Sequence, residues 1–395
     1  MSKRTPQPEA PDRAALVSVQ QRRTSANDSL AELEQLSTSA GYQLAGELSC
    51  VRARPDAATF IGSGKLGELE DLVTTTQADA IIFDNALSPI QQRNLEKALG
   101  RPVIYRTGLI LEIFARRAQS AEGKMQVELA RLEHLATRLV RGWTHLERQK
   151  GGIGLRGGPG EKQIELDRRM LDDKIKMLRT RLGKLGRQRS TQRRSRGRTG
   201  AFRVALVGYT NAGKSTLFNA LTGARSYAAN QLFATLDTTT RKLFLAPDVN
   251  VVLSDTVGFI RDLPHTLIEA FKATLEDTLQ ADLLLHVVDS SSPALREQMD
   301  DVQAVLHEIG ADDIPQFLIL NKADLLPVDI ELPNGRDDVA ADGSRASISR
   351  FAVSALKGTG LVALKAAILE AARSAPRYDR VASSAALPDS TSFSA

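Results

Sequence analysis

The fold is decided by the stretch Gly208-Tyr209-Thr210-Asn211-Ala212-Gly213-Lys214-Ser215, which matches the pattern of a phosphate-binding loop. Phe202 to Val207 is an apolar, β-prone run that predicts a buried strand, and Ser215 to Leu221 predicts a helix. Glycines let the loop turn its amides toward phosphate oxygens, and the helix N-terminus adds positive potential. The alternative, a chance match in an ordinary α/β protein, is disfavoured because both flanking elements are present. We expect Lys214 to reach the terminal phosphates and Ser215 to bind Mg²⁺.

The chain has 395 residues, which predicts two or three domains, and its 42% hydrophobic and 25% charged content is typical of a globular protein. No apolar run is long enough to cross a bilayer, and the polar start, Met1 to Arg13, lacks the apolar stretch of a signal peptide. We therefore expect a cytoplasmic protein. Its single cysteine, Cys50, excludes an internal disulfide and a cysteine zinc site.

The first part of the chain alternates between strand and helix patterns. Strands are expected at 14–19, 46–52, 80–83 and 102–105, with helices at 29–37 and 64–74 and a third helix capped by Ser88. This order predicts a small α/β domain with a mainly parallel sheet. Gly62-Ser63-Gly64-Lys65 lacks the spacing of a second phosphate loop and is interpreted as a strand-to-helix turn.

A heptad seam follows, interrupted by a glycine-rich loop. Apolar residues step by four and three from Met125 to Leu146 and resume from Ile164 to Leu185, which predicts an antiparallel helical hairpin with a packed seam. The loop, Gly151 to Gly160, contains six glycines in ten residues. It is interpreted equally well as a flexible connector or as a surface that presents amides, Arg156 and the neighbouring Lys162 to a polyanion.

Positive charge gathers after the hairpin. No acidic residue lies between Asp173 and Asp237, and 187–200 is rich in Arg, Ser, Gln and Gly. We interpret this stretch as a tether facing RNA, because Lys and Arg displace counterions from phosphate backbones. The expected divisions are a disordered arm at 1–13, the α/β subdomain at 14–112, the hairpin at 113–186, a basic linker at 187–200, the nucleotide domain at 201–373 and a low-complexity tail at 374–395.

The last large domain is predicted to be doubly wound α/β, with its ligand at the carboxyl ends of the strands. The expected strands are 204–207, 243–245, 249–255, 283–289, 316–320 and 351–354, with helices near 269–279 and 294–309. Each further motif follows one of these strands.

Three motifs define the expected ligand. Asp255-Thr256-Val257-Gly258 places a carboxylate where it can hold Mg²⁺ and a glycine amide near the γ-phosphate. Asn321-Lys322-Ala323-Asp324 offers a carboxylate that accepts two hydrogen bonds from guanine, which adenine cannot donate. Ser354-Ala355-Leu356-Lys357 would close over the base. Each motif alone is explained by an ordinary turn, but together they predict guanine nucleotide binding.

A switch segment needs a hydroxyl that binds Mg²⁺ only while the γ-phosphate is present. Within Phe233 to Arg241 we select Thr235, although Thr239 and Thr240 compete on composition. The expected catalytic groups are Lys214, Thr235 and Gly258, and the expected metal ligands are Ser215, Thr235 and Asp255. The expected nucleotide-binding residues are Gly208, Tyr209, Thr210, Asn211, Ala212, Gly213, Lys214, Ser215, Thr216, Phe233, Ala234, Thr235, Leu236, Asp237, Asp255, Thr256, Val257, Gly258, Asn321, Lys322, Ala323, Asp324, Ser354, Ala355 and Leu356.

These motifs, in this order, resemble the translation-factor class of GTPases. The segments Arg106 to Leu111, Gly142 to Lys150 and Gly151 to Gln163 resemble the HflX family of ribosome-associated GTPases. The resemblance implies a GTP hydrolase that binds the large ribosomal subunit and its rRNA as a monomer and acts in ribosome rescue, recycling or splitting. Tyr105, Lys162 and Thr238 depart from the family pattern, which usually has an acidic residue, threonine and proline at these positions.

The position after the second motif is occupied by Phe259, where many GTPases place a water-orienting glutamine. We therefore expect slow intrinsic hydrolysis that a ribosomal partner accelerates. Asn211 stands where potassium-stimulated relatives hold K⁺, which makes K⁺ a second expected cofactor. Two alternatives stay open: an RNA-binding assembly factor whose turnover is incidental, and a separate ATP-using module in the N-terminal half.

Overall fold

The structure is a computed structural model that describes residues 12–20, 26–149, 159–197, 200–224, 231–261, 263, 267, 272–327, 335–337 and 348–375. The chain separates into two compact units. The first contains residues 1–182 together with Gln231–Phe233 and Leu263–Ala270, and the second contains the rest. Most of the expected arm, the glycine-rich loop up to Gly158 and most of the expected tail lie outside the described residues.

The N-terminal unit contains a four-stranded, wholly parallel sheet in the order β2-β1-β3-β4. Each expected strand and helix of this region is present. Apolar residues on the sheet pack against the helices to form one core, which includes Val17, Leu69 and Phe83. The elements are β1 (Arg13–Gln20), α1 (Ala26–Ser39), β2 (Gln43–Val51), α2 (Ser63–Thr76), β3 (Ala80–Phe83), α3 (Pro89–Leu99) and β4 (Val103–Tyr105).

Helix α3 begins where the sequence predicts. The Ser88 hydroxyl accepts a hydrogen bond from the Gln91 amide, and the Gln91 side chain accepts one from the Ser88 amide. This capping box satisfies two amides that have no partner within the helix. Pro89 at the first helical position reinforces the start, and Gly100 ends the helix in the left-handed region with φ of 62°.

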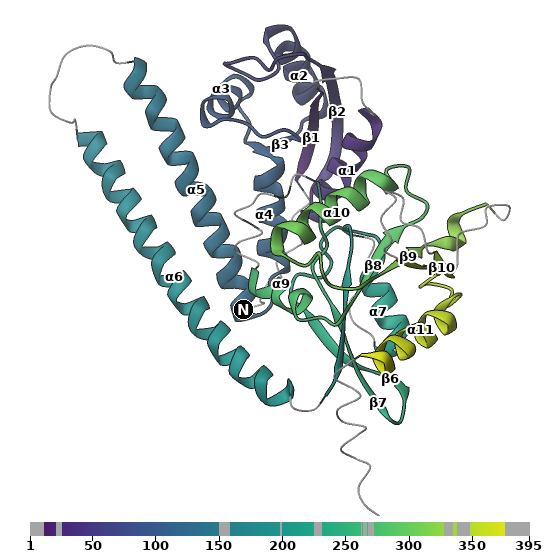
Figure 1. Cartoon of the computed structure of the whole chain (residues 1–395). Helices are drawn as coiled ribbons and strands as arrows, with labels where there is room; N and C mark the ends of the chain where they lie inside the picture. The colour runs from purple at the N-terminus through teal and green to yellow at the C-terminus, as the bar shows by residue number, and fades with distance from the viewer. Residues whose placement is uncertain are drawn as a thin grey trace, which may run out of the picture. The chain divides into compact units, whose positions relative to one another are not determined.

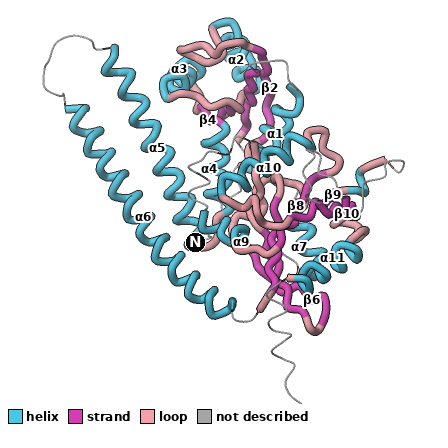
Figure 2. The backbone as a smooth tube through the Cα atoms, in the orientation of Figure 1, coloured by secondary structure: helices cyan, strands magenta, loops and turns pink. Residues whose placement is uncertain are grey.

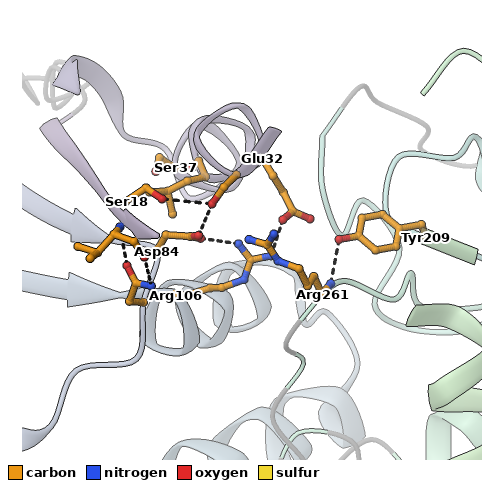
Figure 3. Close-up of polar contacts among 11 residues, drawn as sticks. Ser18, Glu32, Ser37, Asp84, Arg106, Tyr209 and Arg261 are labelled. Carbon is orange, nitrogen blue, oxygen red and sulfur yellow. Dashed lines mark hydrogen bonds and ion pairs between the residues drawn. The ribbon is translucent and has the colours of Figure 1, made fainter. Parts of the chain in front are cut away.

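A buried charge network fixes the carboxyl edge of this sheet. Arg106 follows β4 and pairs with Asp84 and Glu32, both at 2.7 Å. Ser29 donates to the other oxygen of Asp84 at 2.5 Å and lies 3.3 Å from the Ser18 hydroxyl. Figure 3 shows Asp84 and Glu32 pointing toward the Arg106 guanidinium. Because the guanidinium is buried, its two carboxylates offset the desolvation of its charge.

The helical hairpin follows α4 (Arg106–Arg117) and consists of α5 (Ala121–Gln149) and α6 (Pro159–Gly197). The two helices run antiparallel side by side (Figure 1). Leu129 on α5 packs with Ile175 and Leu178 on α6, as the heptad pattern predicts. The ion pairs Lys174–Glu128 and Arg179–Glu133, at 2.7 and 2.8 Å, flank this contact.

Helix α6 extends further than the sequence analysis expects. Residues 187–197, assigned there to a flexible basic linker, are helical. The physical reason is that this stretch contains no proline and is rich in Arg and Gln, which are good helix formers. The positive charge is therefore carried on a helix.

Tyr105, one of the departures from the family pattern, connects β4 to α5. Its hydroxyl is hydrogen-bonded to His134, and the Arg138 guanidinium lies 4.4 Å from the centre of its ring. Arg138 also donates to the Leu87 carbonyl at 2.9 Å. A cation over an aromatic ring is stabilising, so this departure provides a contact between the sheet and the hairpin.

The second unit contains a seven-stranded sheet in the order β10-β11-β9-β8-β5-β7-β6, parallel except for its two edge strands. This is the expected doubly wound arrangement. Of its strands, only the three-residue β10 was not expected. The elements are β5 (Phe202–Val207), α7 (Lys214–Thr222), β6 (Thr239–Ala246), β7 (Val249–Asp255), α9 (Lys272–Leu279), β8 (Leu283–Asp289), α10 (Leu295–Ile309), β9 (Gln316–Asn321), η1 (Ala323–Leu325), β10 (Gly335–Asp337), β11 (Ile348–Ala352) and α11 (Leu361–Ser374).

Helices cover both faces of this sheet, and Figure 2 shows its strands among them. The larger core joins α7 and α11 to the strands through Leu217, Phe218, Leu364 and other apolar residues. A smaller cluster on α10 packs against β8 and β9. Within the described part of the chain, no helix is both long and apolar enough to cross a membrane.

Candidate nucleotide site

The loop between β5 and α7 has the backbone geometry that its glycines predict. Gly208 has φ of 148°, and a Cβ atom built there would lie 2.1 Å from the Val287 carbonyl oxygen. Gly213 has φ of 93°, and a Cβ atom there would lie 2.2 Å from Asn321 Nδ2. Since an L side chain would collide at both positions, only glycine allows the loop to pass this close to β8 and β9.

Lys214 is buried at the first turn of α7. Its ammonium donates to the carbonyl oxygens of Gly208 at 3.1 Å and Tyr209 at 2.7 Å. Burial lowers the pKa of Lys214 to about 8, and the nearby Asp255 carboxylate acts in the opposite direction. The carbonyl oxygens of the loop thus bind the lysine ammonium. The phosphates of a bound nucleotide would replace these two carbonyl contacts.

The three expected metal ligands meet at one point. Ser215 Oγ donates to Asp255 Oδ2 at 2.6 Å. The hydroxyl of Thr235 lies 2.7 Å from Ser215 Oγ and 3.0 Å from the same Asp255 oxygen. These groups come from α7, from the segment before β6 and from the end of β7, so the sheet topology brings them together.

The polar atoms around this point fit a cation and a phosphate. Among the described residues, nothing bonds to the buried oxygens Asp255 Oδ1 and Thr210 Oγ1. Burial raises the pKa of Asp255, while hydrogen bonding from Ser215 and the charge of Lys214 oppose that shift. One carboxylate and two hydroxyls are the oxygen ligands that Mg²⁺ accepts, with water and phosphate oxygens completing its shell. No group of three or more His, Cys, Asp or Glu side chains that could hold a metal ion occurs in the part of the chain that the structure describes.

The loop after β7 closes on the phosphate loop through the backbone. Thr210 donates to the Phe259 carbonyl at 2.7 Å, and Phe259 donates to the Gly208 carbonyl at 3.1 Å. A Cβ atom at Gly258 would lie 2.8 Å from Lys214 Nζ, so a side chain there would occupy the space beside the ammonium. Phe259 is only 1% exposed. Its ring is therefore buried.

Tyr209, a residue of the phosphate loop, makes a further contact with the segment after Asp255. The tyrosine hydroxyl accepts a hydrogen bond from the Arg261 amide at 2.9 Å (Figure 3). Together with the bridge between Tyr209 and Phe259, this contact ties the segment after Asp255 to the phosphate loop. The sequence did not predict the contact between Tyr209 and Arg261, because a tyrosine at this position of the loop has no fixed role.

The expected base site is assembled at the ends of β9 and β11. Hydrogen bonding from Ser354 lowers the pKa of Asp324, and Lys357 lies 3.9 Å from its carboxylate. Asp324 is therefore ionised and able to accept hydrogen bonds at neutral pH. The Ser354 hydroxyl also accepts a hydrogen bond from the Lys357 amide at 3.1 Å, which shapes the loop next to the carboxylate.

Asn321 joins the phosphate and base ends of the site. Its side-chain amide donates to the Ala212 carbonyl at 2.9 Å, and its oxygen accepts from the Ala355 amide at 3.0 Å. Lys322 pairs with Asp289 at 2.6 Å. The sequence motif selected Asn321. It did not predict that Asn321 forms hydrogen bonds with two other loops, because these contacts join residues far apart in the chain.

Of the expected nucleotide-binding residues, Phe233 occupies an unexpected place. It belongs to the N-terminal unit, where its ring packs against Phe114 with centroids 4.6 Å apart. Leu236 is also buried. Among its neighbours in the chain, Thr235 is the residue whose side chain bonds to Ser215 and Asp255.

The fold and the arrangement of these motifs define a P-loop GTPase. Three family models match consecutive parts of the chain: the N-terminal region of GTP-binding GTPases at residues 27–115, their middle region at 117–196, and the 50S ribosome-binding GTPase domain at 203–322. Together they cover most of the N-terminal unit, including the hairpin, and most of the second unit.

The relatives identify the particular family. The chain is 50% identical to GTPase HflX of Escherichia coli K12 over 92% of this chain and 83% of that protein. It is 51% identical to GTPase HflX of Magnetococcus marinus over 80% of this chain and 74% of that protein. The crystal structure of SsGBP with GDP covers 91% of this chain and 98% of its own, with 25% identity and a TM-score of 0.52. The chain belongs to the HflX family of GTPases, and its reaction is the hydrolysis of GTP.

Proposed function

We propose that this protein couples GTP binding and hydrolysis to the large ribosomal subunit and acts in the rescue, recycling or splitting of ribosomes. The observation that carries the GTP switch is the convergence of Ser215, Thr235 and Asp255 on one point beside the phosphate loop. The ribosomal partner is supported by the family model for 50S ribosome-binding GTPases. The many arginines and lysines in the sequence of α6 add to this support, because such residues bind RNA backbones.

The residues of the site have separate proposed roles. Loop amides from Gly208 to Thr216 surround the phosphates, and Lys214 neutralises their charge. Ser215 and Thr235 bind Mg²⁺ directly and Asp255 orients its shell, where the bound ion would neutralise charge that develops on the β- and γ-phosphates. The Gly258 amide approaches the γ-phosphate.

Recognition of the base is assigned to the other end of the site. Asp324 accepts from the ring N–H and amino group of guanine, while the loop at 354–356 covers the base. Asn321 and Lys322 hold that end through their contacts with Ala212 and Asp289. The proposed nucleotide contacts of Ala234, Leu236, Asp237, Thr256, Val257 and Ala323 are made by the backbone.

The position of Phe259 supports activation by a partner. Since its ring is buried and carries no hydrogen-bonding group, this residue cannot orient the attacking water. We propose that the large subunit reorganises the switch segments and completes the catalytic geometry. Asn211, which has φ of 61°, is proposed to contact K⁺. Equal hydrolysis rates in K⁺ and Na⁺ would exclude this role.

Co-sedimentation with purified ribosomal subunits tests the proposal. We expect the chain to sediment with the large subunit in a non-hydrolysable GTP analogue and to be released in GDP. An equal distribution in both nucleotides would contradict a GTP-controlled ribosomal partner. Full biological output with the analogue through repeated cycles would favour the alternative function of a nucleotide-switched assembly factor. The proposal places the protein in the cytoplasm as a monomer.

A further inference from the structure

Within the second unit, the pairing between β5 and β7 continues past the ends of both strands. The last paired residues of the two strands are Leu206 and Asp255. A further parallel bridge joins Tyr209 to Phe259. The amide and the carbonyl of Phe259 each form a hydrogen bond with the backbone of the phosphate loop, at 3.1 and 2.7 Å. The phosphate loop and the segment that follows β7 are therefore joined as a short extension of the sheet.

The two chains do not advance equally between these pairs. The side of the phosphate loop advances by three residues, from Leu206 to Tyr209, and the other side advances by four, from Asp255 to Phe259. An extra residue on one of two paired chains forms a bulge on the longer side, and such bulges redirect the chain next to active sites. Gly258 lies in this longer segment, immediately before Phe259.

Gly258 is held between two fixed points of the backbone. On one side the Thr256 hydroxyl donates to the Leu206 carbonyl at 2.5 Å, and on the other side is the bridge of Phe259. A Cβ atom at Gly258 would lie 2.8 Å from Lys214 Nζ, a distance typical of a hydrogen bond between an ammonium and an oxygen. A side chain at Gly258 would therefore compete with a phosphate oxygen for the ammonium.

The side chain of Tyr209 extends the pairing towards the end of the segment. Its hydroxyl accepts a hydrogen bond from the Arg261 amide at 2.9 Å, two residues beyond the bridge (Figure 3). Tyr209 is only 7% exposed, and a closely packed ring has few conformations available to it. The phosphate loop thus holds the segment after Gly258 through a side chain as well as through the backbone. Tyr209, Gly258 and Arg261 all belong to the second unit.

We infer that Tyr209 is a positioning residue, whose hydroxyl holds the segment that contains Gly258 in place for the γ-phosphate and thereby favours GTP over GDP. This inference rests on the proposed contact between the Gly258 amide and the γ-phosphate. A segment released from the hydroxyl populates further conformations, and GTP must then select the competent one, which weakens GTP binding. GDP has no γ-phosphate, so its affinity does not depend on this contact.

Tyr209→Phe tests the inference, because it removes the hydroxyl and keeps the ring and the backbone bridge. Affinities for GDP and for a non-hydrolysable GTP analogue are measured in the full chain with Mg²⁺ present. We expect the analogue to bind about fivefold more weakly, which is within the range for the loss of one hydrogen bond, while GDP affinity changes less than about twofold. Deuterium exchange at the Arg261 amide should become faster, because the amide loses this acceptor.

Tyr42→Phe is the matched control. It also removes one tyrosine hydroxyl, which donates to Glu112 at 3.3 Å in the N-terminal unit and has no proposed part in nucleotide binding. The ratio of analogue to GDP affinity should not change in this variant. Three results would overturn the inference: an unchanged ratio in Tyr209→Phe, tighter binding of the analogue by Tyr209→Phe, or an equal change in Tyr42→Phe.

Gly258→Ala separates this inference from the proposed function, because its methyl group would meet Lys214 and Thr210. If Gly258→Ala lowers the ratio of analogue to GDP affinity and Tyr209→Phe does not, the positioning role is wrong and the proposed contact with the γ-phosphate stands. If Gly258→Ala leaves the ratio unchanged, the proposed contact fails, and the positioning role fails with it.

Discussion

Ser215 Oγ donates a hydrogen bond to Asp255 Oδ2 over 2.6 Å, which joins the start of α7 to the end of β7 at the phosphate loop. The contact brings together two oxygens that would share one Mg²⁺ shell. It therefore shows that the protein arranges this part of the site through its own hydrogen bonds.

Ser215→Ala removes one of these oxygens. We expect GTP affinity in Mg²⁺ to fall by at least about tenfold, because contacts to charged groups contribute about 1.5–3 kcal/mol. Titration of a fluorescent GTP analogue at several Mg²⁺ concentrations measures the change. Thr222→Ala is the control, since Thr222 lies on the same helix and its hydroxyl bonds to backbone groups at the end of that helix, the Phe218 carbonyl and the Ala224 amide. Equal Mg²⁺ dependence in both variants would exclude Ser215 as a ligand.

The pKa of Lys214 predicts how nucleotide binding depends on pH. Burial lowers this pKa to about 8 in the free protein, and a bound triphosphate raises it, so binding takes up a proton. Affinity should therefore fall as pH rises through 8, by roughly fourfold between about pH 7.5 and 8.7. Isothermal titration in buffers of different ionisation enthalpy would detect the proton uptake. Binding that does not vary over this range would contradict a lysine that is partly neutral before binding.

Asp324→Asn should change the base that the site accepts. The asparagine amide places a donor opposite the amino group of guanine, whereas the carbonyl of xanthine at the same position accepts from it. Affinity for GTP should fall by about a hundredfold, and xanthosine triphosphate should become the better ligand. Competition against a fluorescent nucleotide measures both. A variant that retains its preference for GTP would assign base recognition to another residue.

Phe259→Gln should not create a faster enzyme. Because the ring is 1% exposed, glutamine would be buried in an apolar place, which costs on the order of 2–4 kcal/mol of stability. We expect a lower Tm and no gain in intrinsic hydrolysis, with Phe259→Leu as the milder control. Faster intrinsic turnover in the glutamine variant would show that this side chain reaches the attacking water.

Local patterns predicted most of the fold. Strands β5, β7 and β9 are largely apolar runs that end at or just before Gly208, Asp255 and Asn321, so their positions followed from the sequence. Strand β10 was missed because its three residues, Gly335, Arg336 and Asp337, include no apolar or β-branched residue that would signal a strand. The helical extension of α6 was missed because its basic composition also suits a solvated linker.

Short sequence motifs also selected the residues proposed for the site, and their roles stay predictions. Lys214, Ser215, Asp255 and Asp324 belong to short motifs whose spacing reflects their chemistry. By contrast, the packing of Phe233 against Phe114 and the hydrogen bonds of Asn321 to Ala212 and Ala355 join residues that are far apart in the chain. Such contacts follow from tertiary packing, which no local period or motif encodes.

The central claim is that the large ribosomal subunit completes the catalytic geometry of this HflX-family GTPase and so accelerates its GTP hydrolysis. Single-turnover GTP hydrolysis with and without purified large ribosomal subunits tests that claim most directly. We expect slow hydrolysis by the chain alone and an increase of at least about tenfold with large subunits, equivalent to about 1.4 kcal/mol of transition-state stabilisation. Equal rates in the two conditions would contradict the account.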